Sequence, residues 1–210
     1  VIEKVAASNS RVLISGAPGS GKEVAARQLH TLSQRWRGPF VVVNAAAIAP
    51  ERMEIELFGT ESNGGERKVG ALEEAHRGTL YIDEVGDMPR ETQGKILRVL
   101  VDQQFERVGG TKRVKVDVRI ISSTAQNLEA MIAEGRFRED LLFRLNVVNL
   151  KLPPLRERPG DIVALAEHFV ARYSAANGLT QRVLSQSARD ELVKAPWQGN
   201  VRELENTLHR

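Results

Sequence analysis

Residues 11–30, RVLISGAPGSGKEVAARQLH, join an apolar strand-like run, a glycine-rich turn and a helical stretch. The turn has the P-loop spacing G-x-x-x-x-G-K, made by Gly16, Ala17, Pro18, Gly19, Ser20, Gly21 and Lys22. Glycines let backbone N–H groups converge on phosphate oxygens, and the following helix presents its positive end. We therefore predict a nucleotide-phosphate site in residues 16–23, with Lys22 reaching the β- and γ-phosphates.

One position of this motif departs from the general pattern. Glu23 stands where Ser or Thr usually supplies a hydroxyl to Mg²⁺. The plain alternative is a glycine-rich turn followed by a chance lysine. The strand before it, the helix after it and a pair of acids further along the chain favour the P-loop.

That acidic pair ends the apolar run at residues 79–84, TLYIDE. Asp83 would organise Mg²⁺, through water, and Glu84 would polarise the attacking water, which is a poor nucleophile on its own. Two surface acids at the end of a strand are the alternative, and alone they would be the better interpretation. Together with the P-loop, they predict hydrolysis of ATP with Mg²⁺ as cofactor.

The rest of the chain alternates between strand-like and helical segments. Near-continuous Val, Ile and Leu predicts strands at residues 11–15, 40–44, 79–83, 117–123 and 146–152. Helices are predicted at residues 22–33, 50–58, 69–76, 89–104 and 128–134. This order is typical of a parallel sheet covered on both faces, so we expect an α/β fold of three layers, αβα.

Two further segments complete the expected organisation. Residues 105–116, FERVGGTKRVKV, predict a hairpin that turns at Gly109 and Gly110. After the prolines of LPPLRERPGD, helices are predicted at 161–176, at 185–194 and from about residue 200. We therefore predict a nucleotide-binding domain of residues 1–152 and a small helical lid of residues 153–210.

Composition excludes several other functions. The chain of 210 residues has 30 Lys and Arg against 27 Asp and Glu, a small excess that is weak evidence for nucleic-acid binding. It has no cysteine, and its four histidines lie far apart, so we predict neither a disulfide nor a histidine metal site. With no membrane-length apolar run and no signal peptide, we expect a cytoplasmic fragment of a longer protein.

With these motifs in hand, the chain resembles the AAA+ ATPase domain of bacterial enhancer-binding proteins, which remodel RNA polymerase carrying sigma-54. The resemblance covers essentially all 210 residues. The matching motifs are GAPGSGKE (16–23), ELFG (56–59), GTLYIDEVGDMP (78–89), RVGG (107–110), GRFREDLLFRLN (135–146), LPPLRER (152–158) and WQGNVREL (197–204). In this family Glu follows the P-loop Lys, so Glu23 is compatible with ATP.

The resemblance implies roles for residues that the motifs alone do not assign. Asn44 matches the asparagine that switches the catalytic Glu on or off, and Thr124 matches the sensor-one threonine. Ala125 follows it where the family often has Asn or His. Arg202 matches the sensor-two arginine of the lid, and we expect Asn200 to cap its helix.

Arg138 and Arg144 match the arginine fingers of the family. A guanidinium supplied across a subunit interface offsets charge that develops on the γ-phosphate. Without the family, two helix-surface arginines six residues apart are the simpler interpretation. The resemblance implies a nucleotide-dependent ring of identical subunits, a hexamer.

One motif of the family is missing. After ELFG, enhancer-binding proteins carry a GAFTGA loop whose Phe contacts sigma-54, whereas residues 60–69 here read TESNGGERKV. The segment is shorter, contains no Phe, and predicts a turn at Gly64 and Gly65 between solvated charges: Glu61, Glu66, Arg67 and Lys68. It resembles the NtrX-type branch of nitrogen-related response regulators, and predicts no sigma-54 contact of the usual kind.

Three functions remain open. The first is a motor that remodels a transcription complex containing sigma-54. The second is a nucleotide-controlled assembly module of a two-component response regulator, which binds DNA only through a C-terminal domain outside this chain. The third is a nucleotide-binding scaffold with little turnover, which the presence of Glu84, Asn44 and both finger arginines disfavours. We favour the second, with hydrolysis retained and the transcription machinery as partner.

Overall fold

The computed structural model describes the chain except residues 1, 63–64, 181 and 210. The chain divides into two compact units: Val1–Ser15 with Glu23–Leu150, and Gly16–Lys22 with Lys151–Arg210. The phosphate loop therefore groups with the C-terminal helices, although it follows the first strand in sequence. The predicted domain boundary after residue 152 stays a prediction.

The first unit is built on a five-stranded sheet with the order β2-β5-β8-β1-β9. Its strands are β1 (Val12–Ser15), β2 (Phe40–Asn44), β5 (Thr79–Asp83), β8 (Arg119–Thr124) and β9 (Val148–Lys151). The pairs β2–β5, β5–β8 and β8–β1 are parallel, with Asn44 beside Asp83 and Ser15 beside Thr124. Because parallel strands end at the same edge, their last residues lie along one edge of the sheet.

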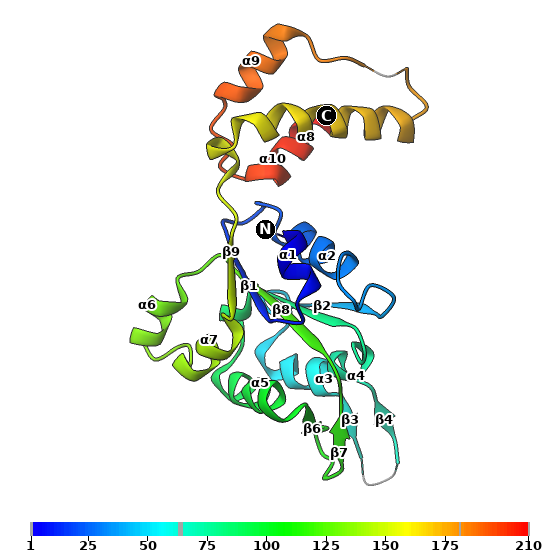
Figure 1. Cartoon of the computed structure of the whole chain (residues 1–210), viewed down its shortest axis with the longest axis vertical. Helices are drawn as coiled ribbons and strands as arrows, with labels where there is room; N and C mark the ends of the chain where they lie inside the picture. The colour runs from blue at the N-terminus through cyan, green and yellow to red at the C-terminus, as the bar shows by residue number, and fades with distance from the viewer. Residues whose placement is uncertain (1, 63–64, 181, 210) are drawn as a thin grey trace. The chain divides into compact units, whose positions relative to one another are not determined.

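Helices cover this sheet on both faces. The helices are α1 (Ile2–Ala7), α2 (Lys22–Thr31), α3 (Met53–Phe58), α4 (Ala71–Glu74), α5 (Arg90–Asp102), α6 (Leu128–Ala133) and α7 (Glu139–Leu145). In Figure 1, α1 and α2 lie on one side of the sheet and α3, α4 and α5 on the other. The chain first moves from β1 out to β2 and then returns in the opposite direction through β5 and β8. Because crossovers between parallel strands are right-handed, the helix of the first connection and those of the return lie on opposite faces of the sheet. The predicted α/β fold is confirmed.

The core of this unit lies mainly between the sheet and the helices that follow β2. Its fully buried side chains include Leu57, Leu80, Ile82, Ile96, Leu141 and Leu145. Apolar residues on α5 recur at helical spacing, so one face of this helix packs inward while the other stays in solvent. The carboxyl ends of the strands are thus fixed by a packed core.

Several predicted helices are shorter in the structure. Residues 50–58 form a 3₁₀ turn, η1 (Pro50–Arg52), followed by α3, and the helix predicted at 69–76 is the four-residue α4. Helix α5 was predicted to reach residue 104 but ends two residues earlier, at Asp102, because Gln103 adopts the left-handed conformation (φ 51°). Helices α1 and α7 were not predicted, and both are short.

Two hairpins project from the first unit. Strands β6 (Gln104–Glu106) and β7 (Arg113–Lys115) pair antiparallel, which confirms the hairpin predicted at residues 105–116. Strands β3 (Thr60–Glu61) and β4 (Arg67–Lys68) also pair, so the segment predicted to be a plain polar loop is a second hairpin. A turn was predicted at Gly64 and Gly65. Gly65 has φ 88°, and Gly64 lies outside the described residues.

The second unit contains the predicted C-terminal helices. They are α8 (Pro159–Ala176), α9 (Gln186–Lys194) and α10 (Asn200–His209), preceded by a 3₁₀ turn, η3 (Leu155–Glu157). Their core is formed by Leu155, Ile162, Ala166, Phe169, Trp197 and Leu204. Among the described helices of the whole chain, none is both long and apolar enough to cross a membrane.

Candidate functional site

The phosphate loop of residues 16–21 has the backbone that its glycines permit. Gly19 has φ 75°, and a Cβ atom there would lie 2.4 Å from the carbonyl oxygen of Gly199. A non-glycine residue would therefore be strained and would also clash with the residues before α10. Within the loop, the N–H of Ser20 donates to the Ala17 carbonyl at 3.2 Å, which closes a tight turn.

The carbonyl groups of this loop are held by the C-terminal unit. Asn200 Nδ2 donates to the Pro18 carbonyl at 3.1 Å, and the Val201 N–H donates to the Gly19 carbonyl at 2.9 Å. Arg158 Nη2 donates to the Ser20 carbonyl at 3.1 Å. In a trans peptide the N–H points opposite to the C=O, so these contacts direct the N–H groups of the next residues away from the helices. The loop therefore presents backbone donors, as an anion site requires.

Two side chains of the loop add to this polarity. Lys22 is 6 % exposed, and its ammonium donates to the carbonyls of Gly16 (3.0 Å) and Ala17 (3.4 Å). The Ser20 hydroxyl is buried and has no hydrogen-bond partner among the described residues. A buried polar group without a partner is costly, and a bound phosphate would satisfy it. Glu23, in contrast, forms a surface ion pair with Arg27 at 2.7 Å.

Arg202 lies where the C-terminal unit meets the loop. It lines a cavity of about 490 Å³ together with Pro18, Gly19, Gln198, Gly199 and Glu203. The structure gives the Arg202 guanidinium no ion pair in the described part of the chain, and its side chain is exposed. An exposed, unpaired guanidinium beside a phosphate loop suits recognition of an anion.

Asn200 does not cap its helix, so that prediction was wrong. It adopts the left-handed conformation (φ 55°), and its Oδ1 accepts a hydrogen bond from the Leu155 N–H at 2.8 Å. Because Nδ2 donates to Pro18, the 2 % exposed side chain links the phosphate loop to η3. The amino end of α10 is closed instead by Glu203, whose carboxylate accepts from the Gly199 N–H at 2.7 Å.

In the first unit, Asp83 belongs to a small polar cluster at the end of β5. Its Oδ1 lies 3.0 Å from the Tyr81 hydroxyl and accepts a hydrogen bond from Ser123 Oγ. The Tyr81 hydroxyl also lies 2.9 Å from Ser123 Oγ. Burial raises the pKa of Tyr81, so its hydroxyl keeps its proton and acts as a donor.

This cluster leaves one Asp83 oxygen for another ligand. Both neighbouring hydroxyls lie against Oδ1, so Oδ2 accepts no hydrogen bond from the described residues. No group of three or more His, Asp or Glu side chains in the described part of the chain could hold a metal ion. A cation here would therefore keep most of its ligands from water and phosphate, as Mg²⁺ commonly does.

Glu84 is positioned by the backbone of two strands. It adopts the left-handed conformation (φ 53°, ψ 55°), which is uncommon for a residue other than glycine and turns the chain out of β5. Its carboxylate accepts a hydrogen bond from the Ala125 N–H at 2.9 Å, and its own N–H donates to Ser123 Oγ at 3.4 Å. Backbone outliers of this kind concentrate at functional sites.

Asn44 and Thr124 also end strands at this edge of the sheet. Asn44 is the register partner of Asp83, and its Oδ1 accepts a hydrogen bond from the Ala46 N–H at 3.0 Å. Thr124 Oγ1 accepts from the Gln126 N–H at 3.0 Å and is 3 % exposed. Asn44, Asp83, Glu84 and Thr124 therefore come together along one edge.

The two predicted finger arginines lie at opposite ends of α7. Arg138 precedes the helix, and its guanidinium contacts both oxygens of Asp140, at 3.0 and 2.8 Å. This ion pair lowers the pKa of Asp140. Arg144 is exposed in the last turn and has no ion pair within the described ranges. Beside it, Phe143 is 81 % exposed.

Three members of the polar edge were not predicted: Tyr81, Ser123 and the backbone of Ala125. Ser123 and Tyr81 lie on neighbouring parallel strands, and their contact depends on the register of β5 and β8. The only signal in the sequence was their position, one and two residues before a predicted site residue. Ala125 acts through its N–H, which no side-chain pattern reveals.

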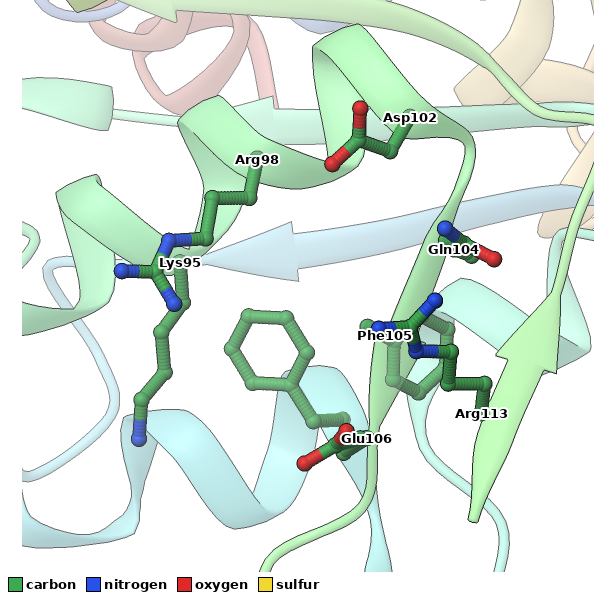
Figure 2. Close-up of a pocket in the computed structure, with 8 residues that line it drawn as sticks. Lys95, Arg98, Asp102, Gln104, Phe105, Glu106 and Arg113 are labelled. Atoms are coloured by element: carbon green, nitrogen blue, oxygen red, sulfur yellow. The ribbon is translucent and has the colours of Figure 1, made fainter. Parts of the chain in front are cut away.

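A separate pocket of about 280 Å³ lies beside α5 and the β6–β7 hairpin, and it contains none of the predicted site residues. Figure 2 shows its labelled charged side chains around two aromatic rings. The rings of Phe58 and Phe105 meet edge to face, with their centroids 5.5 Å apart. The remaining lining residues are Lys95, Arg98, Asp102, Gln104, Glu106 and Arg113. Positive and negative charges are both present, so the pocket favours neither kind of ion.

The β3–β4 hairpin is tied to the body of the unit by an ion cluster around Arg107. The Arg107 side chain is 5 % exposed, and it donates to Glu61 at 3.0 Å and to both oxygens of Glu73, at 2.7 and 2.9 Å. Arg67 also pairs with Glu73, at 2.6 Å. The prediction of a solvated charge was wrong for Glu61, which is bound by Arg107. Arg67 is exposed as predicted, although it pairs with Glu73.

The fold and these motifs define a P-loop nucleotide-binding α/β domain followed by helices. Two family models match the chain: the Sigma-54 interaction domain over residues 1–151 and the AAA+ ATPase lid domain over residues 156–210. The chain belongs to the sigma-54 interaction domain family of AAA+ ATPases.

Its relatives include regulators of nitrogen metabolism. The chain is 55 % identical over 210 residues to the nitrogen assimilation regulatory protein NtrX of Azorhizobium caulinodans, covering all of this chain and 46 % of that protein. Crystal structures of NtrX from Brucella abortus with ADP and with ATP match it with TM-scores of 0.94 and 0.92, both at 62 % identity. They cover all of this chain and 46 % and 48 % of those chains. The chain thus spans about half the length of the relatives it matches.

Proposed function

We propose that this chain is the ATP-binding and ATP-hydrolysing domain of a nitrogen-related, two-component transcriptional regulator. The observation that carries the proposal is the phosphate loop, whose carbonyls at Pro18, Gly19 and Ser20 are each held by a residue of the C-terminal unit. The N–H groups of Gly19 and Gly21, which follow the Pro18 and Ser20 carbonyls, are thereby left for a polyphosphate. Two NtrX structures of Brucella abortus contain ADP and ATP, which supports the same ligand class here.

Each residue of the proposed ATP site would have its own chemical role. Lys22 and the loop N–H groups would bind the β- and γ-phosphates, and Asp83 would hold Mg²⁺ through water. The metal, when bound, neutralises charge on the phosphates. Glu84 would orient and polarise the attacking water, and its fixed position at the end of β5 supports this role.

Three residues would report the state of the nucleotide. Asn44 would switch Glu84 between idle and active positions, and Thr124 would sense the γ-phosphate. Arg202 would reach the nucleotide from the lid. The position of Asn44 beside Asp83 and the unpaired, exposed guanidinium of Arg202 support these roles.

Arg138 and Arg144 would act on the nucleotide of a neighbouring subunit, in a ring that forms on nucleotide binding and is a hexamer. The exposed Arg144 and Phe143 support an intersubunit surface on α7. Arg138 would first have to leave Asp140, so assembly would exchange a contact within one subunit for a contact between two.

In the regulator, ATP would control assembly without the usual contact to sigma-54. The hairpin of residues 60–68 supports this, because it lacks an aromatic residue and Arg107 ties it to the body of the unit. An exposed Phe that could anchor a partner is therefore missing at this place. DNA would be bound only by a domain outside this chain, and the partner of the assembly would be the transcription machinery.

A second function is favoured by one observation, the match of residues 1–151 to the Sigma-54 interaction domain. The chain would then be the ATPase of a conventional activator that remodels RNA polymerase holoenzyme. Contact with sigma-54 would in that case use another surface than the hairpin.

Three measurements test these proposals. The first compares ATP turnover of the chain with that of Glu84→Gln, and equal background rates would remove the catalytic assignment. The second traps the ring with a transition-state analogue of ATP and measures sigma-54 binding. A stable complex would favour the second function, and sedimentation with and without ATP would reveal whether assembly depends on nucleotide.

A further inference from the structure

The first unit contains a cleft with a strong excess of positive charge. Its volume is about 750 Å³, and it is lined by the arginines Arg35, Arg37, Arg77 and Arg119, by His76 and by Asp117. None of them belongs to the predicted nucleotide site. Asp117 is the only carboxylate in this set, and it is already paired with Arg35 at 2.6 Å.

Three of the four arginines have no counter-charge. Arg37, Arg77 and Arg119 form no ion pair within the described residues. Arg119 is 2 % exposed, and its guanidinium donates only to the backbone carbonyls of Ser10, Ala6 and Val5, at 3.0 to 3.2 Å. A buried charge without an opposite charge is costly, so an anion bound near Arg119 would be favoured.

The electrostatics of the neighbouring groups agree with this excess. Burial and the charge of Arg35 lower the pKa of Arg119. Burial lowers the pKa of His30, a hydrogen bond to the backbone of Gly38 raises it, and the charge of Arg119 lowers it. Like charges therefore oppose each other around the cleft, and a bound anion would relieve them.

Arg77 is held in a strained backbone conformation. Its φ is 62°, in the left-handed region that disfavours a residue with a Cβ atom. Its N–H donates to the Asp117 carbonyl at 2.7 Å, which fixes the turn at the cleft. Glycine would fit this conformation without strain, so an arginine here points to a use for its side chain.

His76 supplies a further donor. Its Nδ1 accepts a hydrogen bond from the Asp117 N–H at 3.0 Å, so in the neutral ring the proton is on Nε2. The cleft thus combines guanidinium groups, whose planar donors match phosphate oxygens, with an imidazole N–H. Its volume lies in the range of small-molecule sites, about 300–1,000 Å³.

We propose that this cleft, between residues 34–39, residues 76–77 and Arg119, binds the phosphate group of a small molecule. The site shares no residue with the proposed ATP site and would be a second anion site on the domain. The pocket of Figure 2 serves as a contrast, because its arginines lie among carboxylates and it would not select an anion.

Calorimetric titration with inorganic pyrophosphate tests the proposal. The titration uses the chain carrying Lys22→Ala, so that the phosphate loop does not contribute. We expect saturable binding of one pyrophosphate per chain, weakened about tenfold by Arg77→Gly and by Arg37→Ala, the loss expected for one charge-assisted contact. Arg77→Lys should keep most of the affinity, and Arg98→Ala, in the pocket of Figure 2, should leave it unchanged.

Arg77→Gly is suited to testing the binding site because it removes the charge and also relieves the strained backbone. We expect its melting temperature to equal or exceed that of the parent, so a loss of binding could not be assigned to unfolding. Citrate is the control for a general polyanion and should bind at least tenfold more weakly than pyrophosphate. Absence of saturable binding, equal binding of citrate, or equal weakening by Arg98→Ala would overturn the proposal.

A second measurement places the ligand, again in the chain carrying Lys22→Ala so that the phosphate loop does not contribute. The Arg37 guanidinium lies 4.8 Å from the ring centre of Trp36, which is 56 % exposed, so binding at Arg37 should change Trp36 fluorescence. The only other tryptophan, Trp197, is 5 % exposed. Pyrophosphate should change the emission of the chain but not that of Trp36→Phe. A change that survives Trp36→Phe would contradict binding at this cleft.

Discussion

The carboxylate of Glu84 accepts a hydrogen bond from the Ala125 N–H at 2.9 Å. The acid at the end of β5 is therefore held by the backbone just after β8, whatever side chain residue 125 carries. The family often has a polar residue at this position, and its replacement by alanine does not remove the contact. Glu84 and the turn after Thr124 can thus move as one element when the nucleotide changes.

Ser123→Ala tests the polar cluster that supports this edge. Ser123 is fully buried, donates to Asp83 and accepts from the Glu84 N–H. Its loss leaves Asp83 with the Tyr81 hydroxyl alone and removes the acceptor of the Glu84 N–H, so we expect the free energy of unfolding to fall by about 0.5–1.5 kcal/mol. ATP turnover should fall as well, because both acids lose a positioning contact. Chemical denaturation and steady-state turnover are the measurements.

Ser122→Ala is the matched control for this variant. Ser122 is the preceding residue of β8, equally buried, and its hydroxyl has no hydrogen-bond partner among the described residues. Its removal should leave the free energy of unfolding unchanged or raise it, and turnover should stay the same. If both variants behave alike, the cluster around Asp83 does not support the site.

The strands of this site could be predicted because each is a short apolar run that ends in a polar residue. Strand β2 is FVVVN, β5 is TLYID and β8 contains Ile120 and Ile121, and such apolar runs are the pattern of a parallel sheet. Their order and register depend on long-range packing, so the contact between Tyr81 and Ser123 could not be predicted.

The β3–β4 hairpin and Asn200 were misjudged for a related reason. Strands of two residues are too short for an alternating pattern, and these are held by pairing between Thr60 and Val108 and by Arg107. Asn200 looks like a helix cap in sequence, but its left-handed backbone turns the side chain to Pro18 and Leu155. In both cases distant residues override the local preference.

Arg107→Met should destabilise the first unit. Arg107 is buried between Glu61 and Glu73, and removal of one partner from a buried ion cluster typically costs about 3–5 kcal/mol. Arg67→Ala is the control, because Arg67 meets the same Glu73 from an exposed position and should cost less than about 1 kcal/mol. Urea denaturation at neutral pH compares the two, and equal effects would show that the buried position of Arg107 is unimportant.

The same cluster predicts a dependence on pH. Hydrogen bonds from Arg107 lower the pKa of Glu73, so this carboxylate stabilises the fold fully above its unfolded pKa, about 4.3. The contribution is lost as the pH falls through the lowered folded value. The stability difference between the parent and Arg107→Met should therefore be constant above about pH 5 and shrink below pH 4. A difference that grows in acid would contradict the assignment.

Arg138 should act on the nucleotide of a neighbouring subunit. Arg138→Ala and Lys22→Ala should each lose ATP turnover. The first lacks the arginine finger, and the second lacks the lysine that binds the phosphates. When mixed, they should regain activity, because some interfaces combine an intact loop with an intact finger. A mixture that stays inactive would place Arg138 in its own subunit's site or in none. Arg136→Ala is the control, since Arg136 pairs with Glu134 on the surface.

Asn200 should set nucleotide affinity through the phosphate loop. Asn200→Asp keeps the acceptor for the Leu155 N–H but replaces the donor to the Pro18 carbonyl with an oxygen, which repels it. We expect ADP to bind Asn200→Asp about tenfold more weakly than the parent. Asn200→Gly fits the backbone at φ 55° but loses both contacts, so it should also destabilise the helical unit. Lys194→Ala, an exposed change on α9, should alter neither property. Calorimetry with ADP decides, and wild-type affinity in Asn200→Asp would mean that the loop holds its shape without this residue.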